Sequence, residues 1–307
     1  MMQCYESKLL KFSTESKPLL MSTQTIAVWG VAGLGNRMLS LAFALEIAKK
    51  QRRVVVVDWS DGRIGPVGMD LFGDFFEVQD AEVMTMVTGR DAEMDYHPIF
   101  LYKNNSLGRM LRRLSSGRTL WLLKSPIRKK GRRIILPIDI QNPFRKRLIC
   151  LEYQPQGHRF HEVRQIQLRD RFKREAEQLM PSIQSMLGVH VRFSDKKPSS
   201  SLEDLCAVLK ERSEQIFLAT DSLVVMEYLT KEIPSITYVP QRLHDGKSQG
   251  GLHHTMTPED EKLIMFKNSL FDAYLLSQTK FFYGQSNSSF SLVVNAWRNG
   301  EHSTFWC

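Results

Sequence analysis

The sequence of 307 residues has no long apolar run and few cysteines. No stretch approaches the roughly 18 consecutive apolar residues of a transmembrane helix, so we expect no membrane-spanning segment. The cysteines stand far apart, without a C-x-x-C pair, at Cys4, Cys150, Cys206 and Cys307. This scatter argues against a disulfide framework and against a zinc site, and it favours a reducing, cytoplasmic setting.

Residues 1–22 also lack the marks of a secretory signal, because they have neither a continuous apolar core nor a small-residue cleavage pattern. We expect them to form a loosely ordered leader. The remaining composition, 42% hydrophobic and 24% charged, is that of an ordinary globular protein with a buried core.

Acidic residues are nearly absent from residues 103–150, which hold 14 Lys and Arg against the single acid Asp139. This segment carries +13 and the rest of the chain −4, giving the net charge of +9. The segment is either a solvated, variable insertion or a binding surface. As a binding surface it would contact anionic lipid at the periphery of a membrane, or an anionic acceptor. Nucleic acid is not expected, because only Trp121 and Phe144 follow Tyr102 as stacking aromatics.

The first half begins with the pattern of a βαβ unit. Residues 25–29 read as a buried strand, a Gly-rich turn follows, residues 36–50 show helical spacing of apolar residues, and residues 53–58 form a second strand. Further strands are expected near 119–123 and 133–138.

The second half alternates strands and helices more regularly. We expect strands at 186–193, 215–220, 235–239 and 280–283, and helices at 170–180, 201–213, 221–231, 257–277 and 288–297. The alternation predicts an α/β fold with two open parallel sheets, in domains at 23–165 and 166–307.

Polar residues gather where strands and helices of the second half end. They lie in the segments 188–196, 217–222, 271–278 and 284–290. Residues at the carboxyl ends of parallel strands line the ligand crevice of an open sheet. An Arg, two Asp and a Ser-rich turn meeting there would suit a ligand with phosphates and a purine edge.

His190 and Arg192 are two residues apart and share one face of their strand. The guanidinium of Arg192 suits phosphate oxygens, and an Arg buried in a strand without an anion is costly. His190 is either a ligand contact or a satisfied core histidine. Asp195 would orient Arg192 or a nearby backbone amide.

Two more carboxylates stand out. Asp221 ends a strand and begins a helix, and an ordinary N-cap is its favoured single role. Asp272 lies within a helix, where Asp is a poor helix former, and could accept two N–H bonds from a guanine edge. Ser288 and Ser289 precede the last helix and could cap it, hold a phosphate, or both.

The Gly-rich turn holds Gly33 and Gly35, and Asp58 ends the next strand, which invites a dinucleotide interpretation. However, Met38 occupies the place of the third glycine. The two glycines either favour an anion at the helix start or merely permit a tight turn and close packing. Asn36 and Arg37 lie on the first helical turn, where their side chains can point into a crevice.

At these residues the chain resembles the fucosyltransferase superfamily, which includes animal α-1,6-fucosyltransferases, bacterial nodulation fucosyltransferases and protein O-fucosyltransferases. Segment 190–196 looks like that family's first motif and segment 217–221 like its second. Segments 272–278 and 286–290 look like the third, and 33–37 is similar to the N-terminal Gly-rich loop.

The resemblance implies a GT-B-like fold, a GDP-fucose or related GDP-sugar donor, a glycan or protein acceptor, and inversion at the sugar carbon without a metal or other cofactor. The chain has no Asp-x-Asp metal motif, which agrees. By the same resemblance, Arg192 would bind the β-phosphate and Lys196 would lie near the leaving group. Charge stabilisation of the diphosphate would replace the divalent ion.

The resemblance also implies a role for each remaining residue. His190 and Asp272 would bind guanine, and Ser288, with Gly33 and Gly35, would bind phosphate. Asp221 and Ser289 would lie on the nucleotide-sugar side. Asn36 and Arg37 would lie on the acceptor side.

One position departs from the family pattern. The α-1,6 enzymes carry a Glu, assigned as catalytic base, where this chain has Ser200, with Glu203 and Asp204 one helical turn further on. The base is therefore unassigned. Two alternatives stay open, an NAD-dependent oxidoreductase that uses the Gly-rich turn and Asp58, and a non-catalytic module that binds anionic surfaces through residues 103–150.

Overall fold

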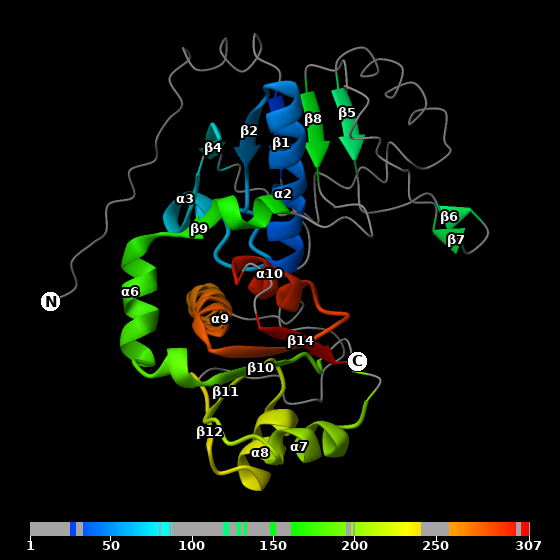
Figure 1. Ribbon diagram of the computed structural model, residues 1–307. Coiled ribbons are helices and arrows are strands. Elements are labelled where there is room, and N and C mark those ends of the chain that lie inside the picture. The colour runs from blue at the N-terminus through cyan, green and yellow to red at the C-terminus, as the bar shows by residue number, and fades with distance from the viewer. Residues whose placement is uncertain are drawn as a thin grey trace, which may run out of the picture.

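The computed structural model describes residues 25–28, 33–79, 81–85, 87, 119–122, 128–129, 132–133, 148–151, 161–194, 198, 200–240, 258–298 and 302–306. The expected leader at 1–22 and most of the basic segment 103–150 lie outside these residues. The described chain forms two five-stranded parallel sheets, one from each half, as the alternation of strands and helices predicted (Figure 1).

The first sheet has the order β4-β2-β1-β8-β5. Its strands are Val83–Thr85, Val54–Val57, Thr25–Val28, Leu148–Leu151 and Thr119–Leu122, in that order. β2 consists of four valines, whose β-branched side chains suit a buried strand. Helix α2, Leu34–Gln51, packs on β1 and β2 and buries most of its residues. It begins two residues before the expected start.

The second sheet has the order β12-β11-β10-β13-β14. Its strands are Ile236–Thr237, Ile216–Thr220, Leu187–Val191, Phe281–Gln285 and Ser303–Trp306. Helices α7 (Leu202–Lys210) and α8 (Leu223–Glu232) cover one face, and α9 (Glu259–Gln278) and α10 (Ser289–Trp297) cover the other (Figure 1). All but β14 were expected, with boundaries shifted by one to three residues.

The strand order of the second sheet marks where a ligand would bind. In chain order it reads third, second, first, fourth and fifth, so the direction of winding reverses between β10 and β13. Open parallel sheets bind ligands outside the carboxyl ends of the strands at such a reversal. The segments after β10 and β13 are the ones that the sequence singled out.

The remaining elements lie outside the two five-stranded sheets, and the last four of them connect one sheet to the other along the chain. They are α3 (Leu71–Phe75), β3 (Phe76–Val78), β6 (Arg128–Lys129), β7 (Arg132–Arg133), η1 (His161–Gln165), β9 (Ile166–Leu168), α6 (Asp170–Leu179) and η2 (Ile183–Ser185). β9 pairs antiparallel with β3, and so joins the first half. Of the strand expected near 133–138, only Arg133, in β7, lies among the described residues.

The two halves share one hydrophobic core. A single cluster of buried side chains contains Val28 from the first sheet, Phe217 from the second and Val293 from α10. Helix α6, which runs along one side from the upper to the lower half, contributes Phe172, whose ring stacks on Phe75 with centroids 4.3 Å apart (Figure 1). The domain division at residue 165 stays a prediction, since the core is continuous across it.

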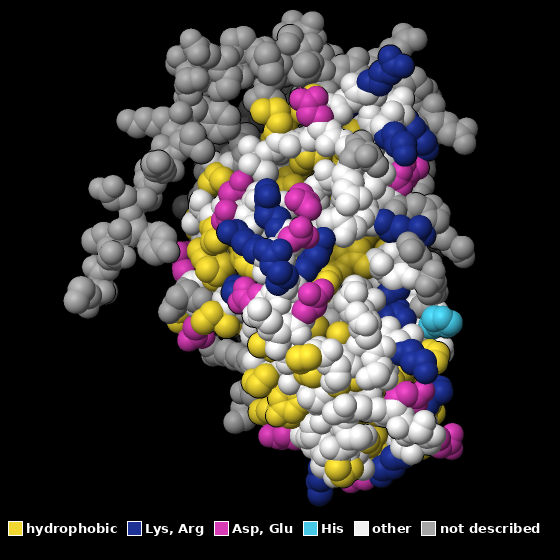
Figure 2. Space-filling model, turned by 60° about the vertical axis from the view of Figure 1, so that its left-hand side comes forward, with side chains coloured by type: hydrophobic (Ala, Val, Ile, Leu, Met, Phe, Trp, Pro, Cys, Tyr) yellow, Lys and Arg dark blue, Asp and Glu magenta, His cyan; other side chains and the backbone are white. Residues whose placement is uncertain are grey.

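The side of the molecule that carries α6 has mixed charge. Figure 2 shows Lys and Arg side chains gathered there with Asp and Glu beside them. The ion pairs on this side include Lys267 with Glu175, at 2.7 Å from Nζ to Oε1, and Lys173 with Asp170, at 3.1 Å. Its positive charges are thus compensated locally, unlike the excess in residues 103–150.

Candidate functional site

The strands β10 and β13 separate at the reversal point. Their parallel pairing runs from Leu187 with Phe281 to Val189 with Tyr283 and stops there. Arg192 is the first residue after β10, so it lies just beyond the strand in which we expected it, and it is partly exposed. Its backbone N–H donates to Oε1 of Gln285, the last residue of β13, at 2.7 Å.

Asp221 fixes the loop that contains Arg192. Its carboxylate accepts hydrogen bonds from the N–H groups of Phe193 at 2.8 Å and Ser194 at 3.3 Å, and from the Ser194 hydroxyl at 2.5 Å. The expected N-cap role was wrong, because α8 begins one residue later and the side chain of Ser222 caps it by accepting from Val225. Asp221 therefore anchors a loop across two strands, and both of its oxygens are used in doing so.

His190 is buried and has protein partners on two sides. Its Nδ1 lies 2.7 Å from Ser291 Oγ, and its ring packs on that of Phe290 with centroids 4.7 Å apart. Burial, and secondarily the charge of Arg192, lower the pKa of His190 from 6.5 to about 3. The imidazole is therefore neutral near neutral pH, where it can exchange hydrogen bonds with a ligand but is a weak base.

This lowered pKa predicts a loss of stability in mild acid. Between its folded pKa of about 3 and its unfolded value of 6.5, His190 takes up a proton only when the chain unfolds, so stability falls as pH drops below 6.5. We expect His190 to contribute a loss of about 1 kcal/mol between pH 6.5 and pH 5.5. Urea unfolding of wild type and His190→Gln across this range measures it. The two proteins losing stability in parallel would contradict the assignment.

Asp272 lies in α9, which packs on the second sheet near β10. The α carbon of Gly188 faces the end of α9, because a Cβ built there would lie 2.6 Å from Thr279 Oγ1 and 3.0 Å from Leu276 Cδ2. Asp272 is one helical turn before Leu276, and His190 is two residues after Gly188 on the same face of β10. Asp272 is 5% exposed. The structure thus places this buried carboxylate beside the reversal point, on the α9 and α10 side of the sheet.

The starts of helices α2 and α10 meet. A Cβ built on Gly35 would lie 2.6 Å from the backbone nitrogen of Phe290 and 2.7 Å from the carbonyl carbon of Ser289. Ser288 is the N-cap of α10, yet its side chain makes no capping bond. Its buried hydroxyl has no hydrogen-bond partner among the described residues. Two positively polarised helix ends and an available hydroxyl therefore come together here.

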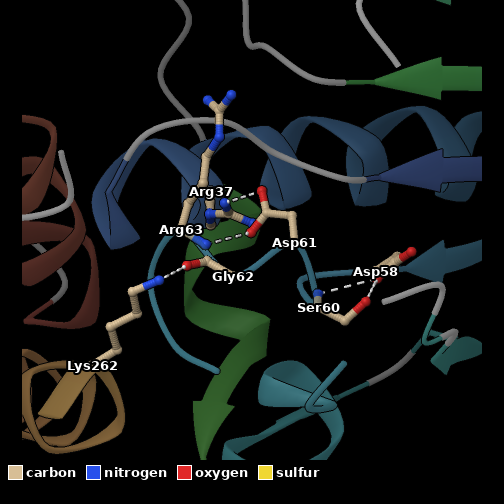
Figure 3. A network of polar contacts seen from close by, with 7 residues as sticks. All are labelled: Arg37, Asp58, Ser60, Asp61, Gly62, Arg63 and Lys262. Atoms are coloured by element: carbon tan, nitrogen blue, oxygen red, sulfur yellow. Dashed lines mark hydrogen bonds and ion pairs between the residues drawn. The ribbon is translucent and has the colours of Figure 1, made fainter. Parts of the chain in front are cut away.

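Arg37 occupies a different place from the one expected. Its side chain is fully buried, and Nη2 contacts Asp61 Oδ2 at 2.6 Å (Figure 3). Asp61 lies in the loop after β2 and also accepts from the Arg63 N–H at 3.2 Å. Lys262 of α9 donates to the carbonyl of Gly62 in the same loop, at 2.9 Å. Arg37 therefore positions the loop after β2, which Lys262 joins to the second half. Its fully buried guanidinium has no surface exposed to an acceptor. Asn36, its neighbour, is partly exposed.

The geometry of the Gly-rich turn does not suit a dinucleotide. The space beside Gly35, which a pyrophosphate would approach, is taken by the backbone of α10. Asp58 is 3% exposed and its Oδ1 accepts from the Ser60 N–H at 3.1 Å and from the Ser60 hydroxyl at 2.5 Å. Asp58 thus forms a turn and Gly35 permits the close packing of α2 on α10, which removes the two residues on which the dinucleotide interpretation rested.

The residues expected near the leaving group and the catalytic base lie before and within the first turn of α7. Asp195 and Lys196 lie outside the described residues. Ser200 is partly buried, while Glu203 and Asp204 are exposed. Asp204 forms the capping box of α7 with Ser201, three residues before it, a spacing typical of this motif. The catalytic base stays unassigned.

Two residues of the site were missed by the sequence reasoning, Gln285 and Ser291. Both are fully buried, and both bond to segments that the motifs did identify. A polar residue that closes an otherwise apolar strand was the signal available for Gln285.

The described part of the chain has neither a metal-binding cluster nor a membrane-spanning helix. No group of three or more His, Cys, Asp or Glu side chains is arranged to hold a metal ion there. No helix in the same part is long and apolar enough to cross a membrane.

Comparisons with known proteins identify the fold. No family profile matches the chain. No curated protein sequence matches it. Solved structures do match. NodZ α-1,6-fucosyltransferase soaked with GDP-fucose is 19% identical, with a TM-score of 0.57 over 89% of this chain and 92% of that chain.

Two further structures agree. NodZ from Bradyrhizobium is 17% identical, with a TM-score of 0.55 over 88% of this chain and 91% of that one. POFUT1 in complex with GDP-fucose is 11% identical, with a TM-score of 0.53 over 92% and 98% of the two chains. At these identities the likeness concerns the fold, and it confirms the expected architecture: the chain has the GT-B-like fold of the fucosyltransferases NodZ and POFUT1.

Proposed function

We propose that the protein is an inverting, metal-independent glycosyltransferase that transfers fucose, or a related sugar, from a GDP-sugar to a hydroxyl of a glycan or protein. The observation that carries this proposal is the meeting of Arg192 and the start of α10 at the reversal point of the second sheet, with the start of α2 against α10. The fold neighbours NodZ and POFUT1, whose solved structures include complexes with GDP-fucose, support it.

The diphosphate would bind between two kinds of positive charge. The guanidinium of Arg192 would contact the β-phosphate, and the N–H groups and Ser288 hydroxyl at the start of α10 would contact the other phosphate oxygens. Ser289 and Gly33 flank this position. The charge that develops on the departing GDP would be stabilised by fixed groups of the protein, so that no divalent ion is needed.

The guanine would lie on the α9 side, near His190 and Asp272. A carboxylate can accept both N–H bonds of the guanine Watson–Crick edge, an interaction that adenine cannot offer in the same form. The neutral His190 would add a hydrogen bond or a ring contact. Lys196 and Asp195 keep the roles implied by the resemblance, near the leaving group and beside Arg192.

The acceptor would bind at the start of α2, next to Asn36. Arg37 would act there indirectly, by holding the loop after β2 through Asp61. With Asp204 engaged in the α7 cap and His190 a weak base, the proton of the acceptor hydroxyl would pass to a group that we do not assign.

Calorimetry with GDP, ADP and NADH tests the donor assignment. We expect GDP to bind, ADP to bind at least about tenfold more weakly because it lacks the guanine edge, and NADH not to bind. GDP-fucose should be hydrolysed slowly to GDP without an acceptor, and at the same rate with EDTA present. Failure of the wild-type protein to bind GDP would overturn the proposal, and binding of NADH in its place would support the oxidoreductase alternative. Loss of hydrolysis in EDTA would overturn metal independence.

A further inference from the structure

Gln285 closes β13 and is fully buried, and the sequence assigned it no role of its own, although it lies within the polar segment 284–290. Its Oε1 accepts from the Arg192 N–H at 2.7 Å, and its Nε2 donates to Asn287 Oδ1 at 2.7 Å. Both ends of the side-chain amide are thus engaged. A buried amide that bonds at both ends has one orientation, because reversing it would place donors against donors.

The side chain of Gln285 spans the gap that opens between the two strands. The backbone pairing of β10 with β13 stops at Val189 and Tyr283. Beyond that pair no ladder partner of β10 on β13 is present, and the Gln285 side chain supplies the acceptor for the Arg192 N–H. On the other side of β10, the carboxylate of Asp221 holds the next two N–H groups. The backbone of Arg192 is therefore fixed from both flanking strands.

The backbone of Gln285 fixes the start of α10. Its carbonyl accepts from the N–H of Ser288 at 3.2 Å, and its own N–H donates to Ser291 Oγ at 3.1 Å. Ser291 Oγ in turn lies 2.7 Å from Nδ1 of His190. One residue thus bonds directly to Arg192 and to the α10 cap, and through Ser291 it reaches His190.

We infer that Gln285 is a positioning residue of the donor site, which sets the Arg192 guanidinium at the correct place relative to the start of α10 so that both grip one diphosphate. This inference rests on the proposed function. Gln285 itself touches no donor atom in this proposal, since its side chain is fully buried and both ends of its amide are engaged by the protein. Its loss should therefore weaken only those interactions that pass through Arg192.

The test is a double-mutant cycle with Gln285→Met, which keeps the length of the side chain and removes the acceptor. We expect Gln285→Met to bind GDP about tenfold more weakly than wild type, with the affinity for guanosine changed less than about twofold. In an Arg192→Ala background the same substitution should change GDP affinity less than about twofold, because the group it positions is gone. Calorimetry on the full chain measures all four proteins.

Gln51→Met is the matched control, because it makes the same substitution at the C-terminal end of α2, where Oε1 accepts from Arg53 Nε at 2.7 Å, away from the predicted site. It should bind GDP like wild type. If Gln285→Met does not unfold cooperatively, Gln285→Asn carries the same test, since its amide is one methylene too short to reach Arg192.

The outcomes separate the two claims. Gln285→Met could weaken the binding of GDP and guanosine equally, or weaken GDP binding by the same factor in the wild-type and Arg192→Ala backgrounds. Either result would show a merely structural role and overturn the inference, while leaving the donor assignment intact. Wild-type affinity in Gln285→Met would overturn it as well. A wild-type protein that does not bind GDP would overturn the proposed function and the inference with it.

Discussion

The Arg192→Ala variant is expected to lose about 2–4 kcal/mol of binding free energy for GDP, the range for a charge-assisted contact in a desolvated site. The reason is the placement of Arg192 at the reversal point of the sheet, with its backbone held by Gln285 and Asp221. A guanidinium fixed in this way loses little conformational entropy when a phosphate binds. Calorimetry with GDP and guanosine measures the effect, which should be confined to GDP.

Arg212→Ala is the control for charge. Arg212 is exposed in the connection between α7 and β11. It thus lies at the amino-terminal ends of the strands, whereas the predicted site lies at their carboxyl ends. Removing it changes the net charge equally without touching the predicted site, so GDP affinity should change less than about twofold at physiological ionic strength. Equal effects of the two substitutions would mean that GDP responds only to overall charge, and the predicted phosphate contact would be wrong.

The Gly35→Ala variant should lower the free energy of unfolding by about 2 kcal/mol and weaken GDP binding. Alanine is the better helix former by up to about 1 kcal/mol, so propensity alone would stabilise the protein. However, the added methyl group would lie 2.6 Å from Phe290 N, 2.7 Å from Ser289 C and 2.9 Å from Phe290 Cα. These are backbone atoms of α10, which cannot rotate away, so we expect the steric cost to exceed the gain. The start of α10 must shift, and the predicted phosphate site shifts with it.

Gly65→Ala is the control for this substitution. There the three atoms nearest to the added methyl group all belong to the Leu71 side chain, at 2.7 to 3.2 Å, and none of them is a backbone atom. Urea unfolding of both variants, followed by GDP calorimetry, tests the prediction. A Gly35→Ala protein more stable than wild type would show that the two helices do not approach as described, and that the two halves are joined differently.

The elements that the sequence predicted well are those with strong local signals. The valine run of β2, the apolar spacing of α2 and the capping box of α7 each depend on residues within a few positions of one another. The sequence predicted no elements for residues 63–85, where the structure has α3 and two three-residue strands, which are too short to show a period. Their structure depends on partners far away, since β3 pairs with β9.

The site was predicted in part. Sequence order and spacing identified the segments that follow β10, β11 and β13, and parallel topology brings these ends to one edge. The roles of individual residues were harder to predict. Asp221 was expected to cap α8, but the helix begins one residue later and its carboxylate binds the neighbouring loop. Arg37 was expected on the acceptor side, but Asp61, 24 residues away, holds it in the interior.

The two parallel sheets, and the residue types that gather at the carboxyl ends of their strands, could be predicted from the chain alone, because hydrophobic period and turn chemistry are local properties. The contacts that hold those residues in place are visible only in the folded protein. Gln285 reaches Arg192 across 93 positions, and Gly35 lies against α10 from the opposite half. Such contacts depend on how strands diverge and how helices cross, and no local pattern in the sequence encodes them.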